Sequence, residues 1–275
     1  MRTIFMIIKA EIIKQYNDSF NSYFTYCSLL LWPILGLFTV YFTYKPFSME
    51  KAAAFGINNG KQLMIFLCTG YVAYNCFWAM VQSAWRFSSR ERTSGTLEMA
   101  FISPANRMAL IYGKALGSLL QQTWMFVSFC IVLLIYVGGF SIRSIVSLPL
   151  LFVILIISST VWGGMLNSLF LFSRDSSILM NVLDDPMVLF SGVKMPVTSL
   201  PHWGQVIGSI FPLTYCLNIS RSLLTNFVDN GFSCNYIMIN LGKLLLCLLL
   251  MFIITKYCMK KAEEKNRKYG NFEFY

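Results

Sequence analysis

Long apolar runs separated by short polar segments make up most of the sequence. A helix needs roughly 20 apolar residues to cross about 30 Å of hydrocarbon, and each run comes close to or exceeds that length. The runs predicted to span the membrane cover residues 24–44, 62–85, 108–137, 145–172, 177–193 and 236–257. The pattern therefore predicts an all-α polytopic membrane protein with six transmembrane helices in a single domain, residues 1–275.

The first 20 residues follow a helical period instead of forming a continuous apolar run. Glu11 and Lys14 fall on one side of such a helix. Apolar residues fall on the other side, at Ile4, Phe5, Ile8, Ile12 and Tyr16. This pattern is typical of an amphipathic helix at a membrane surface, so residues 1–20 are predicted to form an interfacial helix. A short cytosolic lead-in to the first span is the alternative.

The fifth apolar run and the segment after it are too broken for one straight helix. Asp184, Asp185 and Pro186 interrupt the run. Helix-breaking residues then recur at Pro196, Pro201, Gly204, Gly208 and Pro212. Non-helical backbone at membrane depth is tolerated where it is buried in protein, and glycines allow close packing. Residues 194–224 are therefore predicted to form re-entrant half-helices on the outer side.

Composition and charge support a membrane location. The chain is 56% hydrophobic and only 12% charged, whereas soluble domains carry about 25% charged residues. Its net charge is +10, and many of its lysines and arginines cluster in residues 86–107 and in the tail, residues 256–275. Such clusters beside apolar runs follow the positive-inside rule, which favours a lipid bilayer over nucleic acid as the partner. With both termini in the cytoplasm, inner lysines and arginines outnumber outer ones by about two to one.

The sequence offers no catalytic, metal or cofactor site. Its eight cysteines form no C-x-x-C pair, and His202 is its one histidine. The stretch Gly113-Lys114-Ala115 lacks the upstream glycine and the Ser/Thr of a phosphate-binding loop. If ATP powers this protein, ATP and Mg²⁺ are expected on a separate chain.

Two motifs are more specific than these patterns. The first reads Glu91-Arg92-Thr93-Ser94-Gly95-Thr96-Leu97-Glu98, followed by Ser103-Pro104, Arg107 and Gly113-Lys114. The second comprises Phe190-Ser191-Gly192, Pro196, Leu200-Pro201, Trp203, Pro212-Leu213-Thr214-Tyr215 and Arg221. Both resemble motifs of type-2 ABC exporter permeases, in the order found in that family, and the resemblance covers nearly the whole chain.

The resemblance implies roles for both motifs. Residues 86–107 would form the cytoplasmic coupling segment, which docks on the ATPase through Arg92, Gly95, Thr96, Leu97 and Glu98. The outer gate would include Ser191, Gly192, Pro196, Pro201, Trp203, Pro212 and Tyr215. The family also implies two copies of a separate ABC ATPase subunit and a second permease, either identical or similar to this one.

Asp184 and Asp185 depart from the family pattern, in which the fifth span is mostly apolar. A charged side chain at the membrane centre costs at least about 2.5–3.5 kcal/mol on insertion scales. One interpretation is that the carboxylates face the translocation path and bind a cationic or polar substrate. Alternatively, Pro186 unwinds the helix and the carboxylates cap freed amides, or they pair with Arg174 or Lys194.

Taken together, the residues and the resemblance predict the permease subunit of an ATP-driven exporter in a bacterial plasma membrane. Its substrate would be amphipathic, namely a drug, a peptide such as a bacteriocin, or a lipid, moved outward from the cytosol or inner leaflet. The alternatives are export of a lipid-linked polysaccharide or teichoic-acid polymer, and an ion-coupled secondary transporter that uses Asp184 and Asp185.

Overall fold

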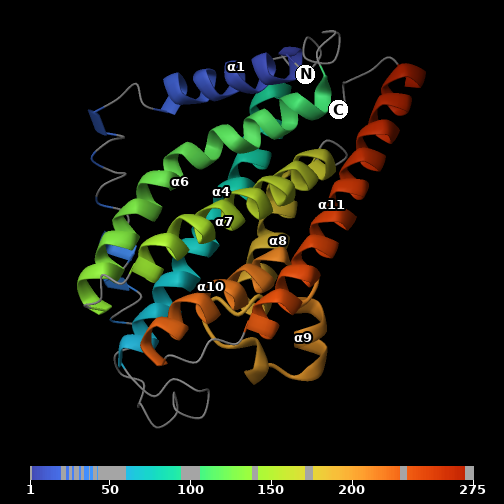
Figure 1. Ribbon diagram of the computed structural model, residues 1–275. Coiled ribbons are helices and arrows are strands. Elements are labelled where there is room, and N and C mark those ends of the chain that lie inside the picture. The colour runs from blue at the N-terminus through green and yellow to red at the C-terminus, as the bar shows by residue number, and fades with distance from the viewer. Residues whose placement is uncertain are drawn as a thin grey trace.

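A computed structural model describes most of the helical parts of the chain (Figure 1). It describes residues 2–19, 60–93, 106–137, 142–170, 176–229 and 234–269, together with residues 23, 24, 27, 31, 34–36, 38, 39 and 42. The elements are α1 (Arg2–Ser19), α4 (Gly60–Thr93), α6 (Arg107–Val137), α7 (Ile142–Phe170), α8 (Ser176–Phe190), the 3₁₀ turn η1 (Val197–Ser199), α9 (His202–Gly208), α10 (Pro212–Asp229) and α11 (Cys234–Tyr269). Every element in these ranges is helical, as predicted.

Helix α4 lies at the centre of the bundle and contacts α6, α7, α8 and α10. Phe77 and Met80 on this helix are fully buried. A Cβ atom at Gly163 of α7 would lie 2.8 Å from the Met80 sulfur, and one at Gly164 would lie 2.5 Å from the ring of Tyr112 on α6. These two glycines therefore bring α7 close against its neighbours.

Helix α11 packs on the edge of the bundle, against α7 and α10. One strip of it is buried, at Leu244, Leu248, Met251, Thr255 and Met259. Its other faces carry exposed apolar side chains. With 36 residues α11 is about 54 Å long, which exceeds the roughly 30 Å of a bilayer's hydrocarbon core. Its basic C-terminal part therefore extends beyond the apolar layer.

The predicted spans correspond to helices in most of their described residues, but α8 ends at Phe190, so the last residues of the fifth predicted span, 191–193, lie in a turn. The predictions 62–85 and 108–137 fall inside α4 and α6. Residues 147–170 of α7 and 235–261 of α11 are long and apolar enough to cross a membrane. Residues 24–44 are described only at scattered positions, of which Gly36 contacts Tyr71 of α4. The helical membrane fold is thus supported, and the six-span topology stays a prediction.

Helix α1 is a helix as predicted, and it packs against α6. A Cβ atom at Gly113 of α6 would lie 3.2 Å from the Ile8 Cα and 3.3 Å from the Glu11 Cβ. The face that contacts α6 therefore includes Glu11, which the sequence pattern assigns to the side opposite Ile8. Phe5 and Tyr16 remain exposed. Part of the predicted apolar face of α1, at Ile8, thus packs against α6, and another part, at Phe5 and Tyr16, is exposed.

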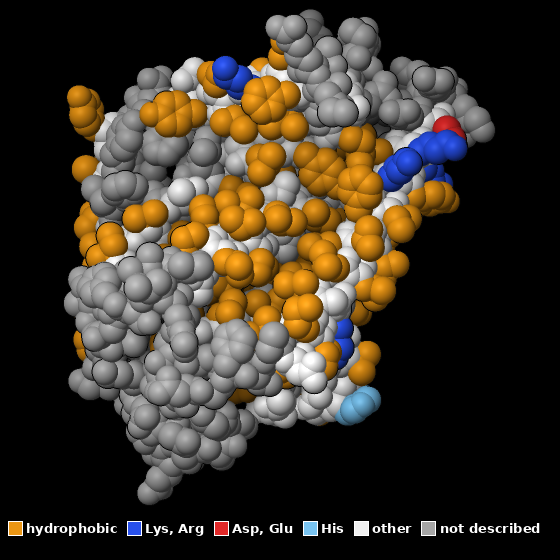
Figure 2. Space-filling model, in the orientation of Figure 1, with side chains coloured by type: hydrophobic (Ala, Val, Ile, Leu, Met, Phe, Trp, Pro, Cys, Tyr) orange, Lys and Arg blue, Asp and Glu red, His pale blue; other side chains and the backbone are white. Residues whose placement is uncertain are grey.

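The two ends of the bundle differ. At one end lie α1, the C-terminal end of α11, the end of α4 and the start of α6, and at the other end lies α9 (Figure 1). Hydrophobic side chains cover the middle of the face shown in Figure 2, and lysines and arginines gather mainly at the end that carries α1 and the C-terminal part of α11. This distribution matches an apolar layer with a basic surface at one end.

We expect these two ends to lie on opposite sides of the membrane. Thr198 and Glu264 are both exposed, the first beside α9 and the second near the end of α11. In a background without native thiols, a cysteine at Thr198 should react with an impermeant maleimide added outside intact cells. A cysteine at Glu264 should react only after the membrane is opened. The reverse labelling pattern would show that the chain has the opposite orientation.

Candidate functional site

A tight turn follows α8 and brings together the first residues of the predicted outer gate. Gly192 has φ +86°, a conformation that glycine adopts readily and other residues rarely adopt. A Cβ atom there would also lie 2.7 Å from a methyl group of Val197. Ser191 and Gly192 are both buried. The turn therefore packs directly on η1, and a side chain at position 192 would disturb both its conformation and its packing.

Prolines precede the two short helices that follow. Pro196 comes before η1 with φ −57° and ψ 140°, and Pro201 comes before α9 with φ −60° and ψ 155°. The proline ring fixes φ near these values, so both residues favour an extended backbone immediately before a helix starts. Pro212 begins α10, where its missing N–H leaves no helical hydrogen bond unmade.

Helix α9 packs closely on the end of α8. A Cβ atom at Gly208 would collide with the backbone carbonyl of Phe190. The rings of Phe190 and Trp203 meet edge to face, with their centroids 5.6 Å apart. The other side of Trp203 is exposed. This small contact holds α9 against the helix from which the chain has just turned away.

Two side-chain hydrogen bonds connect the end of α9 to α10. The Thr214 hydroxyl donates to the Gly208 carbonyl at 2.6 Å, and the Tyr215 hydroxyl donates to the Ser209 carbonyl at 2.8 Å. Both acceptors are carbonyls at the C-terminal end of a helix, which have no partner within that helix. The structure thus gathers all seven predicted outer-gate residues into one folded unit, residues 191–215, which we call the outer segment.

Asp184 contacts a residue that the sequence analysis did not identify. The Tyr74 hydroxyl of α4 donates to both carboxylate oxygens of Asp184, at 3.0 and 3.3 Å. Tyr74 is in turn stacked on Trp78, with 6.3 Å between ring centroids. Asp184 is half-buried and Asp185 is exposed. One carboxylate therefore joins α8 to α4, and the other faces away from the chain's own core.

The structure excludes one of the alternatives proposed for Asp184 and Asp185. Helix α8 runs without a break through Pro186, so the hypothesis that this proline unwinds the helix is wrong. Neighbouring helices can make a proline tolerable in a membrane helix, and α4 contacts α8 here. Lys194, which follows α8, is exposed, and its pairing with Asp184 stays a hypothesis. Arg174 lies outside the described residues.

The predicted coupling residues are only partly described. Arg92 belongs to the last turn of α4. Gly95, Thr96, Leu97 and Glu98 lie outside the described residues. Beyond them, the Asn106 side chain accepts hydrogen bonds from the backbone N–H groups of Met108 and Ala109, at 3.1 and 3.4 Å. This is an N-cap, and it fixes where α6 begins on leaving the coupling segment.

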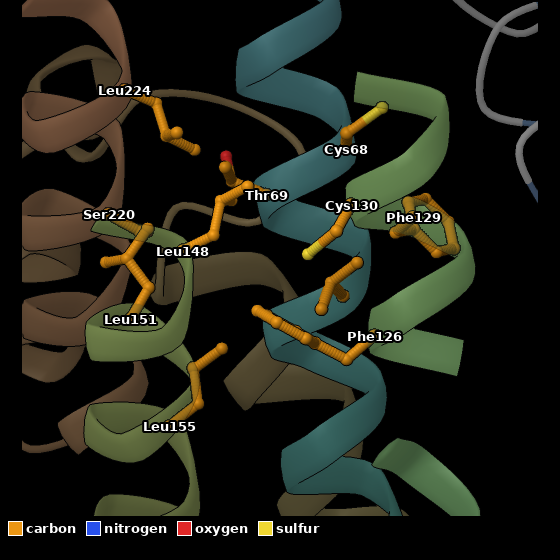
Figure 3. Close-up of a pocket in the computed structure, with 11 residues that line it drawn as sticks. Cys68, Thr69, Phe126, Phe129, Cys130, Leu148, Leu151, Leu155, Ser220 and Leu224 are labelled. Carbon is orange, nitrogen blue, oxygen red and sulfur yellow. The ribbon is translucent and has the colours of Figure 1, made fainter. Parts of the chain in front are cut away.

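A small apolar pocket lies between α4, α6, α7 and α10 (Figure 3). Its volume is about 30 Å³, well below the roughly 300–1,000 Å³ of small-molecule sites. Its lining residues are Cys68, Thr69, Val72, Phe126, Phe129, Cys130, Leu148, Leu151, Leu155, Ser220 and Leu224. The hydroxyls of Thr69 and Ser220 donate to carbonyls of their own helices. The pocket therefore offers neither the space nor the polar groups for an amphipathic substrate.

The part of the chain that the structure describes contains no group of three metal-ligating side chains. As far as the structure describes it, the candidate site consists of the outer segment and the acidic pair on α8 with Tyr74.

Comparison with known proteins supports this assignment. A family described as "ABC-2 type transporter" matches residues 2–225. The chain is 29% identical over 138 residues to the "Probable multidrug ABC transporter permease YbhR" of Escherichia coli strain K12, a match that covers 49% of this chain and 37% of the relative. It is 25% identical over 269 residues to the "Putative transport permease ycf38" of Cyanophora paradoxa, a match that covers 95% of this chain and 89% of the relative.

The match to YbhR thus spans little more than a third of that relative's length, whereas the match to ycf38 spans most of both chains. The family match includes both motifs, the acidic pair and every element from α1 to most of α10. The chain is therefore a membrane permease that belongs to the ABC-2 type transporter family.

Proposed function

We propose that this chain is the membrane subunit of an ATP-driven exporter in the plasma membrane, and that it works as a dimer of permeases with two copies of a separate ATPase. The observation that carries the proposal is the arrangement of the two motifs. The ends of α4 and α6 that border the coupling segment lie at one end of the bundle, and the outer segment lies at the other (Figure 1). ATP and Mg²⁺ would bind to the partner chains.

The translocation path would lie between two permease chains. The described pocket inside the bundle is too small for a substrate. Helix α8, by contrast, has an exposed strip on which Asn181, Val182, Asp185 and Leu189 lie. A carboxylate such as Asp185 is costly against lipid, so this strip fits a hydrated path or a partner chain better than the bilayer. The strip would form half of the path, and the second permease would supply the other half.

The substrate would be amphipathic and would move outward from the cytosol or the inner leaflet. The acidic pair favours a substrate with a cationic group, such as a drug or a peptide, and the multidrug name of YbhR agrees with that class. A lipid or a lipid-linked polymer remains the alternative substrate. Membership of the ABC-2 family favours ATP over an ion gradient as the energy source.

The proposal can be tested by reconstitution with the ATPase. Purified alone, the chain should not hydrolyse ATP, because it contains no phosphate-binding loop. Expressed with its cognate ATPase, it should co-purify and export ethidium, a cationic dye, from loaded vesicles when ATP is supplied. Export should continue when the proton gradient is collapsed at constant ATP. Loss of export on collapsing the gradient would instead favour an ion-coupled transporter.

A variant of the coupling segment tests how the ATPase is engaged. Replacing Leu97 and Glu98 together with alanine removes an apolar anchor and a charge from the predicted docking surface. The variant should co-purify less ATPase, or hydrolyse ATP without exporting substrate. Normal export by this double variant would show that Leu97 and Glu98 do not form the coupling contact.

A further inference from the structure

Arg221 on α10 connects three separate elements. One of its terminal nitrogens, Nη2, lies 3.4 Å from the Phe66 carbonyl of α4 and 3.4 Å from the Val193 carbonyl in the turn after α8. Its guanidinium carbon lies 3.5 Å from the centroid of the Phe66 ring. A planar guanidinium can donate to carbonyls while its face rests on an aromatic ring, and a lysine ammonium cannot reproduce this geometry.

Gly70 makes room for this contact. A Cβ atom at position 70 would lie 2.6 Å from the Val193 carbonyl oxygen and 3.2 Å from Arg221 Nη2. Real Cβ atoms essentially never lie as close to a backbone oxygen as the first of these distances. The turn and the arginine can therefore reach α4 only because position 70 has no side chain.

The contact lies in the first third of a long helix. Helix α4 has 34 residues, so it is about 51 Å long, and its other end leads into the coupling segment. Four other helices pack around it, and its central residues are fully buried. A closely packed helix transmits a displacement along its length, so the outer segment is attached to a rigid element whose C-terminal end leads into the coupling segment.

We propose that Arg221, seated against Gly70, fastens the outer segment to α4, so that a movement of α4 driven from the coupling segment is passed to the outer segment. This inference rests on the proposed function, because it requires an ATPase at the inner end. Arg221 then acts as a positioning residue: it does not bind substrate but decides whether the outer segment follows α4.

The test uses the complex with the cognate ATPase in proteoliposomes, with a single reactive cysteine at Thr198 in a thiol-free background. The rate of maleimide labelling at this cysteine is measured with and without a non-hydrolysable ATP analogue. In the reference protein we expect the analogue to change the labelling rate at least threefold. Arg221→Gln and Gly70→Ala should still hydrolyse ATP, but the labelling rate should no longer depend on the nucleotide, and export should be lost.

Two variants of the same kind control for general effects of substitution, one on α10 and one on α11. Ser222→Ala changes the neighbouring residue on α10 and removes only a hydrogen bond to Asn218 within that helix. Gly242→Ala adds a methyl group to a helical glycine that has nothing within 4 Å of the added atom. Both should keep the nucleotide response of the reference protein. Arg221→Lys should keep less than half of it, because the charge remains but the planar contact does not.

The possible outcomes distinguish this inference from the function on which it rests. If Arg221→Gln and Gly70→Ala respond to nucleotide as the reference protein does, the inference is overturned and the proposed function stands. If the reference protein itself shows no response and no export, both fail. If Arg221→Gln, Gly70→Ala and Arg221→Lys all fail to form a folded complex while both controls assemble, the contact serves folding alone, and the inference is overturned.

Discussion

Replacing Gly208 with alanine is expected to detach α9 from α8 and to sharply reduce the yield of folded protein. The added methyl group would meet the backbone carbonyl of Phe190, and backbone cannot rotate away as a flexible side chain can. Overpacking of this kind typically costs about 1–3 kcal/mol, and we expect the upper end of that range. The Thr214 hydrogen bond to the Gly208 carbonyl would also be strained. Thermal unfolding of the detergent-purified protein measures the loss.

Gly204, one turn earlier in the same helix, provides the control. A Cβ atom there would lie 3.4 Å from both the Leu200 Cβ and the Phe190 ring, which is ordinary van der Waals contact. Because alanine is favoured over glycine inside a helix by about 0.5–1 kcal/mol, Gly204→Ala should be neutral or slightly stabilising. Equal effects of the two substitutions would argue against close packing of α9 on α8.

Removing both carboxylates of α8 should strongly reduce transport of a cationic substrate. In the Asp184→Asn, Asp185→Asn variant the side chains keep their size and can still form hydrogen bonds, but the negative charge is gone. If a cationic group of the substrate contacts this pair, the lost interaction is worth about 1.5–3 kcal/mol, or roughly a 10–100-fold fall in kcat/KM for ethidium. Export from vesicles measures it, and complex assembly and basal ATP hydrolysis should survive.

Tyr74→Phe separates substrate binding from helix packing at the same site. This change removes the hydroxyl that donates to Asp184 but keeps the ring that stacks on Trp78. We expect a smaller loss of transport than in the double variant, because both charges remain and only the position of one is less fixed. Full transport by the double asparagine variant would show that the acidic pair is structural and does not contact the substrate.

The sequence predicted best what depends on local pattern. The spans predicted at 108–137 and 145–172 lie within two residues of α6 and within three residues of α7 at either end. Continuous apolar runs and flanking charges determine such limits. The helix starts after Pro196 and Pro201 and at Pro212 were also predictable, because proline fixes φ and favours a helix start.

Contacts between helices could not be predicted in this way. Tyr74 and Asp184 are 110 residues apart, and Arg221 and the Phe66 carbonyl are 155 apart. Periodicity shows which face of a helix is apolar, but it does not show which other helix that face meets. The continuity of α8 through Pro186 was missed for the same reason, since it depends on the neighbours that support the helix.

The one-sided packing of α11 has a consequence for how the protein tolerates mutation. One strip of it is buried against the bundle, at Asn240, Leu244, Leu248, Met251, Thr255 and Met259, and most of the apolar side chains around it are exposed. Those outer positions need only be hydrophobic, so exchanges among leucine, isoleucine and phenylalanine there should be nearly silent. The same exchanges in the strip would change the packing volume. A saturation-mutagenesis map of α11 should therefore show a single sensitive stripe, repeated every three to four residues, on an otherwise permissive helix.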